Sequence, residues 1–320
     1  MRALLLDKGL QIVEDYPAPE TAPGEALIRV RVAGICNTDL EMVKGYGAFR
    51  GVPGHEFVGV VERAPGAEDW EGRRVVGEIN AACTTCPTCL AGRPTHCPNR
   101  TTLGIAGRDG AFAEYLTLPV RNLHPVPDST PDGIAVFAEP LAAACEILEQ
   151  VHVHPTDRVV VLGDGKLGLL CAQVLALTGC DLTVIGRHKE KLDILTRRGI
   201  STRLEGDDDN TGSADIVIEA TGHPEGFGAA RRLVRPRGTI VLKSTYHGFA
   251  EADLTMAAVD EITLTGSRCG PFTSALRLLE RGSVVVIQLV QARYPLSQAL
   301  AAFERAAQPG TLKVLIDVEP

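Results

Sequence analysis

The N-terminal part of the chain shows short runs in which apolar and polar positions alternate. Alternation of this kind, with β-branched residues inside the runs and glycine or proline between them, is typical of short strands rolled into an antiparallel sheet. The strands predicted in this part are residues 26–33, 57–62, 73–77 and 111–116. The pattern therefore predicts a mainly β region here.

From residue 139 onward, continuous apolar runs alternate with segments of helical periodicity. Glu139-Pro140 opens a helix that extends to Leu148, because proline is tolerated in the first turn. The other predicted elements are helices over 167–177, 274–281 and 297–307 and strands over 158–162, 182–185, 215–219, 238–242 and 313–317. Continuous apolar strands separated by helices indicate a parallel sheet that is covered on both faces. The acidic segment 207–210 is predicted to be a solvated loop.

The change of pattern predicts an α/β protein of two domains, for which 320 residues suffice. Residues 139–272 are expected to form a doubly wound parallel sheet of the Rossmann type. Residues 1–138 and 273–320 are expected to form a mainly β catalytic domain, with a separate lobe over residues 80–100. We find no internal repeat and no low-complexity linker.

Composition and charge exclude several classes of protein. The net charge is −8 and no basic run is present, which argues against nucleic acid as a partner. No uninterrupted apolar stretch approaches the roughly 18 residues that a membrane span requires, so no membrane association is expected. Nine cysteines, an odd number, are typical of a reducing compartment. These features predict a cytoplasmic protein.

Four cysteines lie close together in the predicted lobe: Cys83, Cys86, Cys89 and Cys97. Thiolate sulfur binds Zn²⁺ at about 2.3 Å, and four thiolates close a tetrahedron without an open position. The alternatives are a disulfide cluster or scattered core thiols, and four thiols within fifteen residues, in a chain where no secretion signal is expected, do not favour either. The spacing therefore predicts a structural zinc lobe, which does no chemistry itself.

The segment Gly163-Asp164-Gly165-Lys166-Leu167-Gly168 places a Gly-x-Gly-x-x-Gly motif between a predicted strand and a predicted helix. In such a loop Gly163 permits the tight turn, Gly165 lets the backbone approach a pyrophosphate, and Gly168 allows close packing of helix and strand. The N-terminus of the following helix favours the phosphates through its free N–H groups. We predict a dinucleotide site that includes Lys166 and Leu167.

The end of the next strand bears on the choice between NAD and NADP. An NAD site has an acidic residue here to hold the ribose 2′-hydroxyl, but this chain has Gly186, followed by Arg187 and Lys189. Without a carboxylate, and with a guanidinium that can bind a 2′-phosphate, the sequence favours NADP over NAD. The alternative is that these cations form an ordinary solvated start of a helix.

The remaining residues that can bind a metal are widely spaced. Cys36, His55-Glu56 and Glu139 belong to separate segments, and no local spacing among them predicts a catalytic zinc site. An isolated cysteine is more often part of the core, and a His-Glu pair more often lies at the surface.

At these residues the chain resembles the zinc-dependent medium-chain alcohol dehydrogenase family over essentially its whole length. Gly54-His55-Glu56-Phe57-Val58-Gly59 matches the zinc signature of that family, while the four cysteines match its structural lobe and the glycine motif its cofactor loop. Glu139-Pro140-Leu141 is most similar to the polyol, sugar and threonine dehydrogenase branch. The resemblance implies a GroES-like catalytic domain beside the Rossmann domain.

The resemblance also implies roles for single residues. Cys36, His55 and Glu139 would hold a catalytic zinc, with Glu56 as a possible further ligand and Cys145 as a rival to Glu139. Asp39 would orient the zinc histidine, and Thr38 would bind the substrate oxygen and begin a proton relay. Positions expected to contact the cofactor in its nicotinamide and pyrophosphate parts are Thr221, Gly222 and Lys313. The chain departs from the family at Glu41, where a relay histidine often stands.

The implied activity is NAD(P)-linked oxidation of a secondary alcohol, polyol or sugar to its carbonyl, and the reverse, by a homodimer or homotetramer. Two alternatives stay open from the sequence. One is a zinc-independent reductase of activated double bonds, of the enoyl or quinone type. The other is a non-catalytic NADPH-binding redox sensor whose four-cysteine lobe responds to oxidation. The sequence does not identify the substrate, because loops build such pockets.

Overall fold

The computed structural model describes residues 1–206, 211–246 and 248–318. The acidic segment predicted to be a solvated loop, 207–210, lies outside these residues. The chain divides into two compact units, one of Met1–Glu139 with Phe272–Pro320 and one of Pro140–Pro271. Among the described residues, no helix has the length and apolar character needed to cross a membrane.

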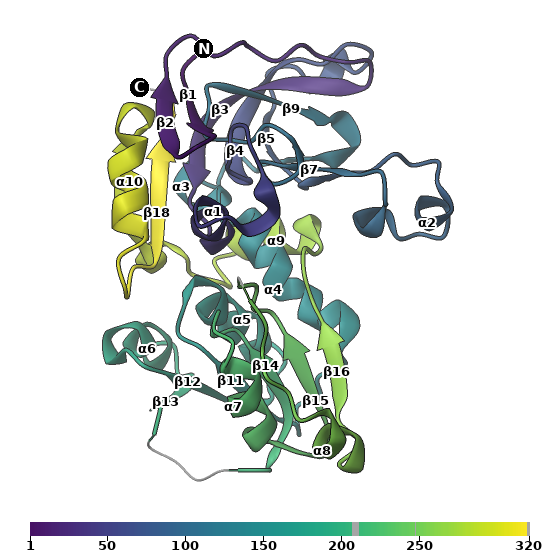
Figure 1. Ribbon diagram of the computed structural model, residues 1–320, viewed down its shortest axis with the longest axis vertical. Helices are drawn as coiled ribbons and strands as arrows, with labels where there is room; N and C mark the ends of the chain where they lie inside the picture. Colours follow the sequence, from purple (N-terminus) through teal and green to yellow (C-terminus); the bar gives the residue numbers. More distant parts are fainter. Residues whose placement is uncertain (207–210, 247, 319–320) are drawn as a thin grey trace. The chain divides into compact units, whose positions relative to one another are not determined.

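The first unit is built on a seven-stranded sheet with β3 (Glu25–Gly34) at its centre (Figure 1). β3 pairs antiparallel with β4, β9 and β18. The alternating burial of β3 follows its alternating sequence, since every second side chain faces the core. The other strands described in this unit are β1 (Ala3–Leu6), β2 (Leu10–Val13), β4 (Glu56–Arg63), β5 (Arg74–Gly77), β6 (Asn80–Ala81), β7 (Thr101–Leu103), β8 (Gly107–Arg108), β9 (Tyr115–Pro119), β10 (Leu123–Pro125), β17 (Val290–Pro295) and β18 (Lys313–Asp317).

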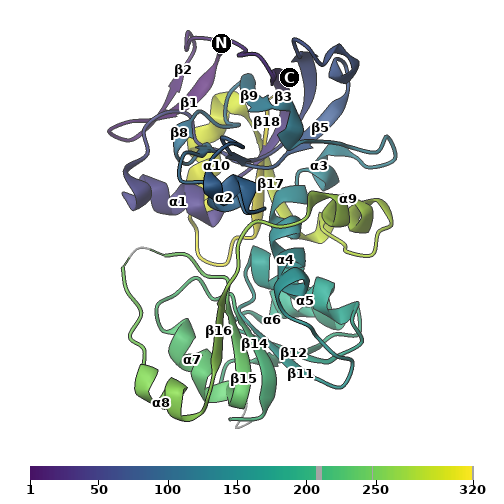
Figure 2. The ribbon, with the colours of Figure 1, turned by 90° about the vertical axis from the view of Figure 1, so that its right-hand side faces the viewer.

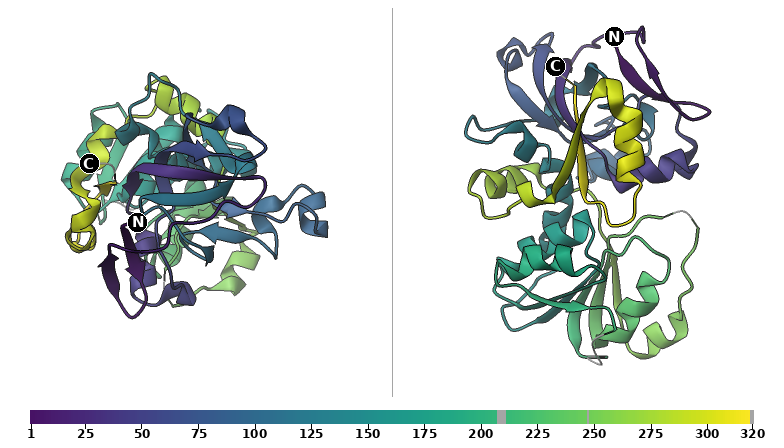
Figure 3. Two further views of the ribbon diagram at one scale, coloured as in Figure 1. Left: turned by 90° about the horizontal axis from the view of Figure 1, so that it is seen from above. Right: turned by 90° about the vertical axis from the view of Figure 1, so that its left-hand side faces the viewer.

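Helices of the first unit are short. α10 lies along β18, as the right-hand view of Figure 3 shows. Its buried positions Ala299, Ala302, Phe303 and Ala306 fall at helical spacing and form one apolar face. The helices described in this unit are α1 (Asn37–Val43), α2 (Pro87–Leu90), α3 (Asp132–Ala135), α9 (Phe272–Glu280) and α10 (Ala299–Ala306). α4 (Ala138–Gln150) begins at the end of this unit and continues into the next.

The second unit contains a six-stranded parallel sheet in the order β13-β12-β11-β14-β15-β16. This is the 3-2-1-4-5-6 order of the Rossmann fold. Figure 2 shows β14, β15 and β16 side by side. The strands are β11 (Arg158–Leu162), β12 (Asp181–Gly186), β13 (Ser201–Leu204), β14 (Ala214–Glu219), β15 (Val234–Leu242) and β16 (Thr263–Gly266), and the helices wholly within the unit are α5 (Lys166–Ala176), α6 (Lys189–Thr196), α7 (Gly226–Leu233) and α8 (Leu254–Val259).

The strand order reverses at β11, and this reversal places helices on both faces of the sheet. α5 and α6 pack against each other and against β12, whereas α7 packs against β14 and β15. Since crossovers are right-handed, those that run in opposite directions from β11 place their helices on opposite faces of the sheet. The predicted fold class is confirmed: a Rossmann unit, and a mainly β unit that carries the four-cysteine lobe.

One predicted strand is wrong in its position. The run 111–116 was expected to be a strand, but the strand is β9 (Tyr115–Pro119), which pairs with β3. The N–H groups of Ala111 and Phe112 donate instead to the carbonyls of Gly54 and Pro53. These bonds to a loop use the donors that a ladder would need, so the apolar run is buried without being a strand.

Candidate functional site

Three ligand-type residues converge where β3 ends and β4 begins. Gly34 pairs with Glu56 across the two antiparallel strands, which brings the next residues of β3 beside His55. The ligand atoms of Cys36, His55 and Glu56 lie within 4.8 Å of one another. A side chain at Gly34 would place its Cβ 2.4 Å from Glu56 Oε2, so glycine is required for this carboxylate to lie where it does.

Asp39 supports this cluster from the first turn of α1. Its carboxylate is fully buried and accepts a hydrogen bond from the Cys36 backbone N–H at 2.8 Å. The other carboxylate oxygen lies 3.3 Å from His55 Nδ1. With Nδ1 beside this carboxylate, Nε2 would be the ring nitrogen left to bind a metal, in the arrangement expected for a histidine ligand. Thr38 lies next to the cluster, with its hydroxyl 3.9 Å from Cys36 Sγ.

Lys313 reaches the cluster from β18. Its ammonium forms an ion pair with Glu56, and both side chains are only 1% exposed. The carbonyl of Ile35 lies 3.4 Å from the ammonium, and the ring centroid of Phe137 lies 5.6 Å from it. The family resemblance led us to expect Lys313 near a pyrophosphate. In the structure this ammonium is buried and has a carboxylate partner, and its place near a pyrophosphate stays a prediction.

The cluster is suited to a divalent cation. With Cys36 as a thiolate, the anions Cys36, Asp39 and Glu56 exceed Lys313 by two charges. Glu56 Oε1 is buried without a hydrogen-bond partner, as a ligand oxygen would be. Burial lowers the pKa of His55, but the nearby Asp39 and Cys36 outweigh burial and raise this pKa well above its usual value. The surroundings therefore attract positive charge to the position of the ring.

Glu139 and Cys145 lie outside this group of three ligands. Glu139 is half-buried in the first turn of α4. Burial lowers the pKa of the Lys313 ammonium, but the nearby charges of Glu56, Cys36 and Glu139 outweigh burial and raise this pKa above its usual value. Cys145 lies further along α4, where burial raises the pKa of its thiol to about 12. The pKa of the Cys89 thiol in the lobe is raised to about 12 as well, so this shift does not decide whether Cys145 is the rival ligand. The role of Glu139 stays a prediction.

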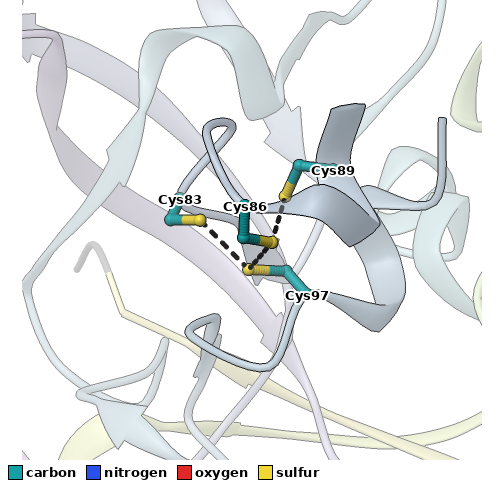
Figure 4. A group of neighbouring side chains, drawn as sticks. All are labelled: Cys83, Cys86, Cys89 and Cys97. Carbon is teal, nitrogen blue, oxygen red and sulfur yellow. Dashed lines mark hydrogen bonds between the residues drawn. The ribbon is translucent and has the colours of Figure 1, made fainter. Parts of the chain in front are cut away.

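The four cysteines of the lobe come together as predicted (Figure 4). Cys86 Sγ lies 3.5 Å from Cys89 Sγ and 3.7 Å from Cys97 Sγ, and Cys97 Sγ lies 3.5 Å from Cys83 Sγ. A zinc–sulfur distance of about 2.3 Å implies edges of about 3.8 Å in a tetrahedron of sulfurs. Backbone N–H groups of Thr85 and Cys86 lower the pKa of the Cys83 thiol to about 5, which favours a thiolate. The donor set therefore fits zinc.

The glycine loop of the second unit joins β11 to α5, as expected. Gly163 has a φ of +114°, and a Cβ on Gly168 would lie 2.0 Å from the Gly163 carbonyl oxygen, so both positions require glycine. A Cβ on Gly165 would meet nothing within 4 Å, which leaves its backbone open to a ligand. α5 begins at Lys166 and continues through Leu167, so its N-terminus faces this open space.

The other predicted cofactor residues lie at the carboxyl ends of the parallel strands. Thr221 N donates to the buried Glu219 carboxylate at 2.9 Å, and Gly222 N donates to Ser244 Oγ at 2.8 Å. These bonds fix the loop after β14. Carboxyl ends of parallel strands, at a reversal of strand order, are where α/β folds bind ligands.

Arg187 and Lys189, at the start of α6, have carboxylate partners on the surface. Arg187 pairs with Glu205, and Lys189 Nζ lies 3.0 Å from Asp193 Oδ1. Asp164, which the sequence analysis passed over, also lies here, because its carboxylate accepts from the backbone N–H of Arg187 at 2.6 Å. An acidic residue inside the glycine motif, combined with glycine at 186, is the signal that could have indicated it.

Comparison with known proteins agrees with this geometry. Residues 22–128 match the model of the alcohol dehydrogenase GroES-like domain, and residues 133–318 match that of the glucose dehydrogenase C-terminus. The chain is 29% identical to D-altritol 5-dehydrogenase of Agrobacterium fabrum over 98% of each chain. It is 32% identical to L-threonine 3-dehydrogenase of Streptomyces avermitilis over 99% of each.

Solved structures of similar proteins extend the comparison to cofactors. A zinc-binding dehydrogenase from Sinorhizobium meliloti bound to NADP superposes with a TM-score of 0.88 at 28% identity. A short chain alcohol dehydrogenase from Escherichia coli CFT073 complexed with NADH superposes with a TM-score of 0.89 at 26% identity. Each alignment covers 99% of both chains.

The fold and the ligand clusters are those of an NAD(P)-dependent oxidoreductase. The chain belongs to the zinc-containing medium-chain alcohol dehydrogenase family, in its polyol, sugar and threonine dehydrogenase branch. It is therefore an alcohol dehydrogenase of the medium-chain class.

Proposed function

We propose that the protein interconverts a polyol, sugar or related secondary alcohol and its carbonyl compound, using a catalytic zinc and NAD(P), with NADP favoured. The observation that carries this proposal is the group of Cys36, His55 and Glu56, whose ligand atoms lie within 4.8 Å of one another. A zinc-independent reductase would have no use for such a donor set. A redox sensor would need only the four-cysteine lobe.

The residues of the first unit have distinct tasks in this proposal. Cys36 and His55 hold the metal, with Glu139 as the expected third ligand and Glu56 as a possible one. Asp39 fixes the ring of His55 and is itself fixed by the Cys36 N–H. Lys313 pairs with Glu56 and offsets its charge at a position where both side chains are 1% exposed.

The chemistry depends on two bound groups. When bound, zinc lowers the pKa of an alcohol as a Lewis acid, and the nicotinamide accepts a hydride. Thr38 is the first protein acceptor for the alcohol proton, because its hydroxyl lies beside Cys36. Glu41, three residues further along α1, pairs with Lys44 at 2.8 Å. Glu41 has no imidazole, so the outer part of the proton path differs from the path of family members that have a relay histidine at this position.

The preference for NADP is supported by the surface pairs of Arg187 and Lys189. Exposed ion pairs contribute about 0–1 kcal/mol, so a 2′-phosphate can recruit either cation at small cost. The two similar structures contain NADP in one case and NADH in the other.

The predicted homodimer or homotetramer is supported by the exposed edge of the second unit. β16 is the last strand of its sheet, and most of its residues are exposed. Exposed apolar side chains accompany it: Leu254, Met256, Val259 and Leu264. An unprotected edge with apolar neighbours is typical of a surface that another chain covers. Light scattering of the wild type and of Leu264→Lys tests this expectation, since the variant should dissociate.

The central experiment combines zinc content, cofactor binding and turnover. Wild-type protein should contain about two zinc ions per chain and reduce NADP⁺ with members of a polyol and sugar panel. Cys36→Ser should lose one zinc and all turnover while binding of the dinucleotide is retained. Cys180→Ser, a change of the same kind at a half-buried cysteine outside both clusters, should leave all three quantities unchanged. Full turnover by Cys36→Ser would refute the zinc mechanism and favour one of the two alternatives.

A further inference from the structure

The loop that follows β11 meets the end of β12 at Asp164 and Gly186. The two strands are parallel neighbours, with Leu162 opposite Ile185, so the residues just beyond them lie side by side. A Cβ on Gly186 would lie 2.6 Å from Asp164 Cβ and 2.7 Å from Asp164 Oδ2. The two positions therefore exclude each other: with Asp164 in place, no side chain fits at 186.

The carboxylate of Asp164 occupies donors at the start of α6. Its Oδ2 accepts hydrogen bonds from the backbone N–H groups of Arg187 and His188, both at 2.6 Å, and lies 3.0 Å from His188 Nδ1. Oδ1 lies 3.7 Å from the ammonium of Lys191, and both side chains are more than nine-tenths buried. The carboxylate is thus held from several directions in one orientation.

Asp164 is ionised in this environment. Burial raises its pKa, but the hydrogen bonds from His188 and the charge of Lys191 outweigh burial, so that the pKa lies below its usual value. A fixed negative charge therefore stands at the end of β12, where dinucleotide-binding folds distinguish a ribose 2′-hydroxyl from a 2′-phosphate.

We propose that Asp164 is a specificity-determining residue of the cofactor site, which acts against a 2′-phosphate. It withholds from a phosphate the two backbone N–H groups of Arg187 and His188, which directly precede the first helical residue of α6, and its charge repels the phosphate dianion. Arg187 and Lys189 act in the opposite direction. Selection between NAD and NADP is then a balance between these outer cations and the inner carboxylate. This inference rests on the proposed function, since it requires that the unit binds a nicotinamide dinucleotide.

The test measures the dissociation constants of NAD⁺ and NADP⁺ by calorimetry on the full-length, zinc-loaded protein, without turnover. Asp164→Asn removes the charge and keeps the shape of the side chain. In this variant the ratio of the NADP⁺ constant to the NAD⁺ constant should fall about ten-fold or more. Asp164→Ser keeps a smaller oxygen acceptor for the N–H groups, and its ratio should change in the same direction. It serves as a second variant if the asparagine substitution disturbs folding.

Asp215→Asn is the matched control. Asp215 also accepts a backbone N–H, that of Arg158 at 2.8 Å, and pairs with Arg235, but it lies at the opposite end of the sheet, near the start of β14. In Asp215→Asn the ratio of the NADP⁺ to the NAD⁺ dissociation constant should change less than about two-fold, because Asp215 is remote from the carboxyl ends of the strands. An unchanged ratio in both Asp164 variants, with both dinucleotides still bound, would overturn the role of Asp164 and leave the proposed function standing. A wild-type protein that binds neither dinucleotide would overturn both.

Discussion

Lys313 and Glu56 form an ion pair in which both side chains are 1% exposed, next to the ligand atoms of Cys36 and His55. The two residues are far apart in the sequence and meet because β3 pairs with β4 on one side and with β18 on the other. An ammonium so placed lets a cluster of anionic ligands exist within a folded core, since isolated buried charges are costly.

Removal of Lys313 should therefore destabilise the first unit strongly. Lys313→Met leaves the Glu56 carboxylate buried without its partner, which costs about 3–5 kcal/mol. The first thermal transition should fall by about 10 °C. The double variant Lys313→Met/Glu56→Gln removes both charges and should recover most of this loss. Equal thermal midpoints for the single and double variants would contradict the assigned pairing.

Loss of one lobe cysteine should remove one zinc ion and leave the other. Cys97 is fully buried and its sulfur lies within 3.7 Å of two other cysteine sulfurs. Cys97→Ser should lower the zinc content from about two ions to about one and lower the thermal midpoint, because metal binding and folding of such a lobe are coupled. Metal analysis together with calorimetry measures both effects. Cys180→Ser is again the control, and a Cys97→Ser protein with undiminished zinc would refute the lobe as a metal site.

Two glycines of the cofactor loop should respond differently to alanine. Gly168→Ala would drive its Cβ to 2.0 Å from the Gly163 carbonyl oxygen, so both stability and dinucleotide affinity should fall. At Gly165 the Cβ meets nothing within 4 Å and the backbone is not in the left-handed region. Gly165→Ala should therefore keep the wild-type thermal midpoint and weaken the dinucleotide about ten-fold or more, because the methyl group occupies the approach to the pyrophosphate. Unchanged affinity would place the cofactor elsewhere.

The stability of the first unit should depend on His124 as the pH falls below about 6.5. Burial lowers the pKa of His124, whose ring stacks on Phe272 at a centroid distance of 5.0 Å. Below about pH 6.5 the unfolded chain takes up a proton that the folded ring does not, so stability falls as the pH drops from 6.5 toward the lowered pKa. His124→Phe keeps a stacking ring without a titrating group. Its thermal midpoint should fall less over this range than that of the wild type, and an equal fall would exclude the effect.

Features that depend only on residues close together in the sequence could be predicted from the sequence. The four cysteines fall within fifteen residues of one another, and the glycine motif lies between one apolar strand and one helix, so each defines its own local geometry. The alternation of apolar strands and helices was enough to predict the parallel sheet, since periodicity reports the direction in which side chains face. The predicted strand 111–116 failed because tertiary hydrogen bonds to Gly54 and Pro53 took its backbone donors.

The sequence by itself determined the class of the fold, the four-cysteine lobe and the position of the dinucleotide loop, because spacing and periodicity act over a few residues. Only the tertiary structure decided that Glu56 lies beside Cys36, that Lys313 neutralises it, and that Asp164 fills the space beside Gly186. These relationships depend on strand pairing and register between distant segments. No local pattern encodes them, because the residues concerned have no fixed separation along the chain.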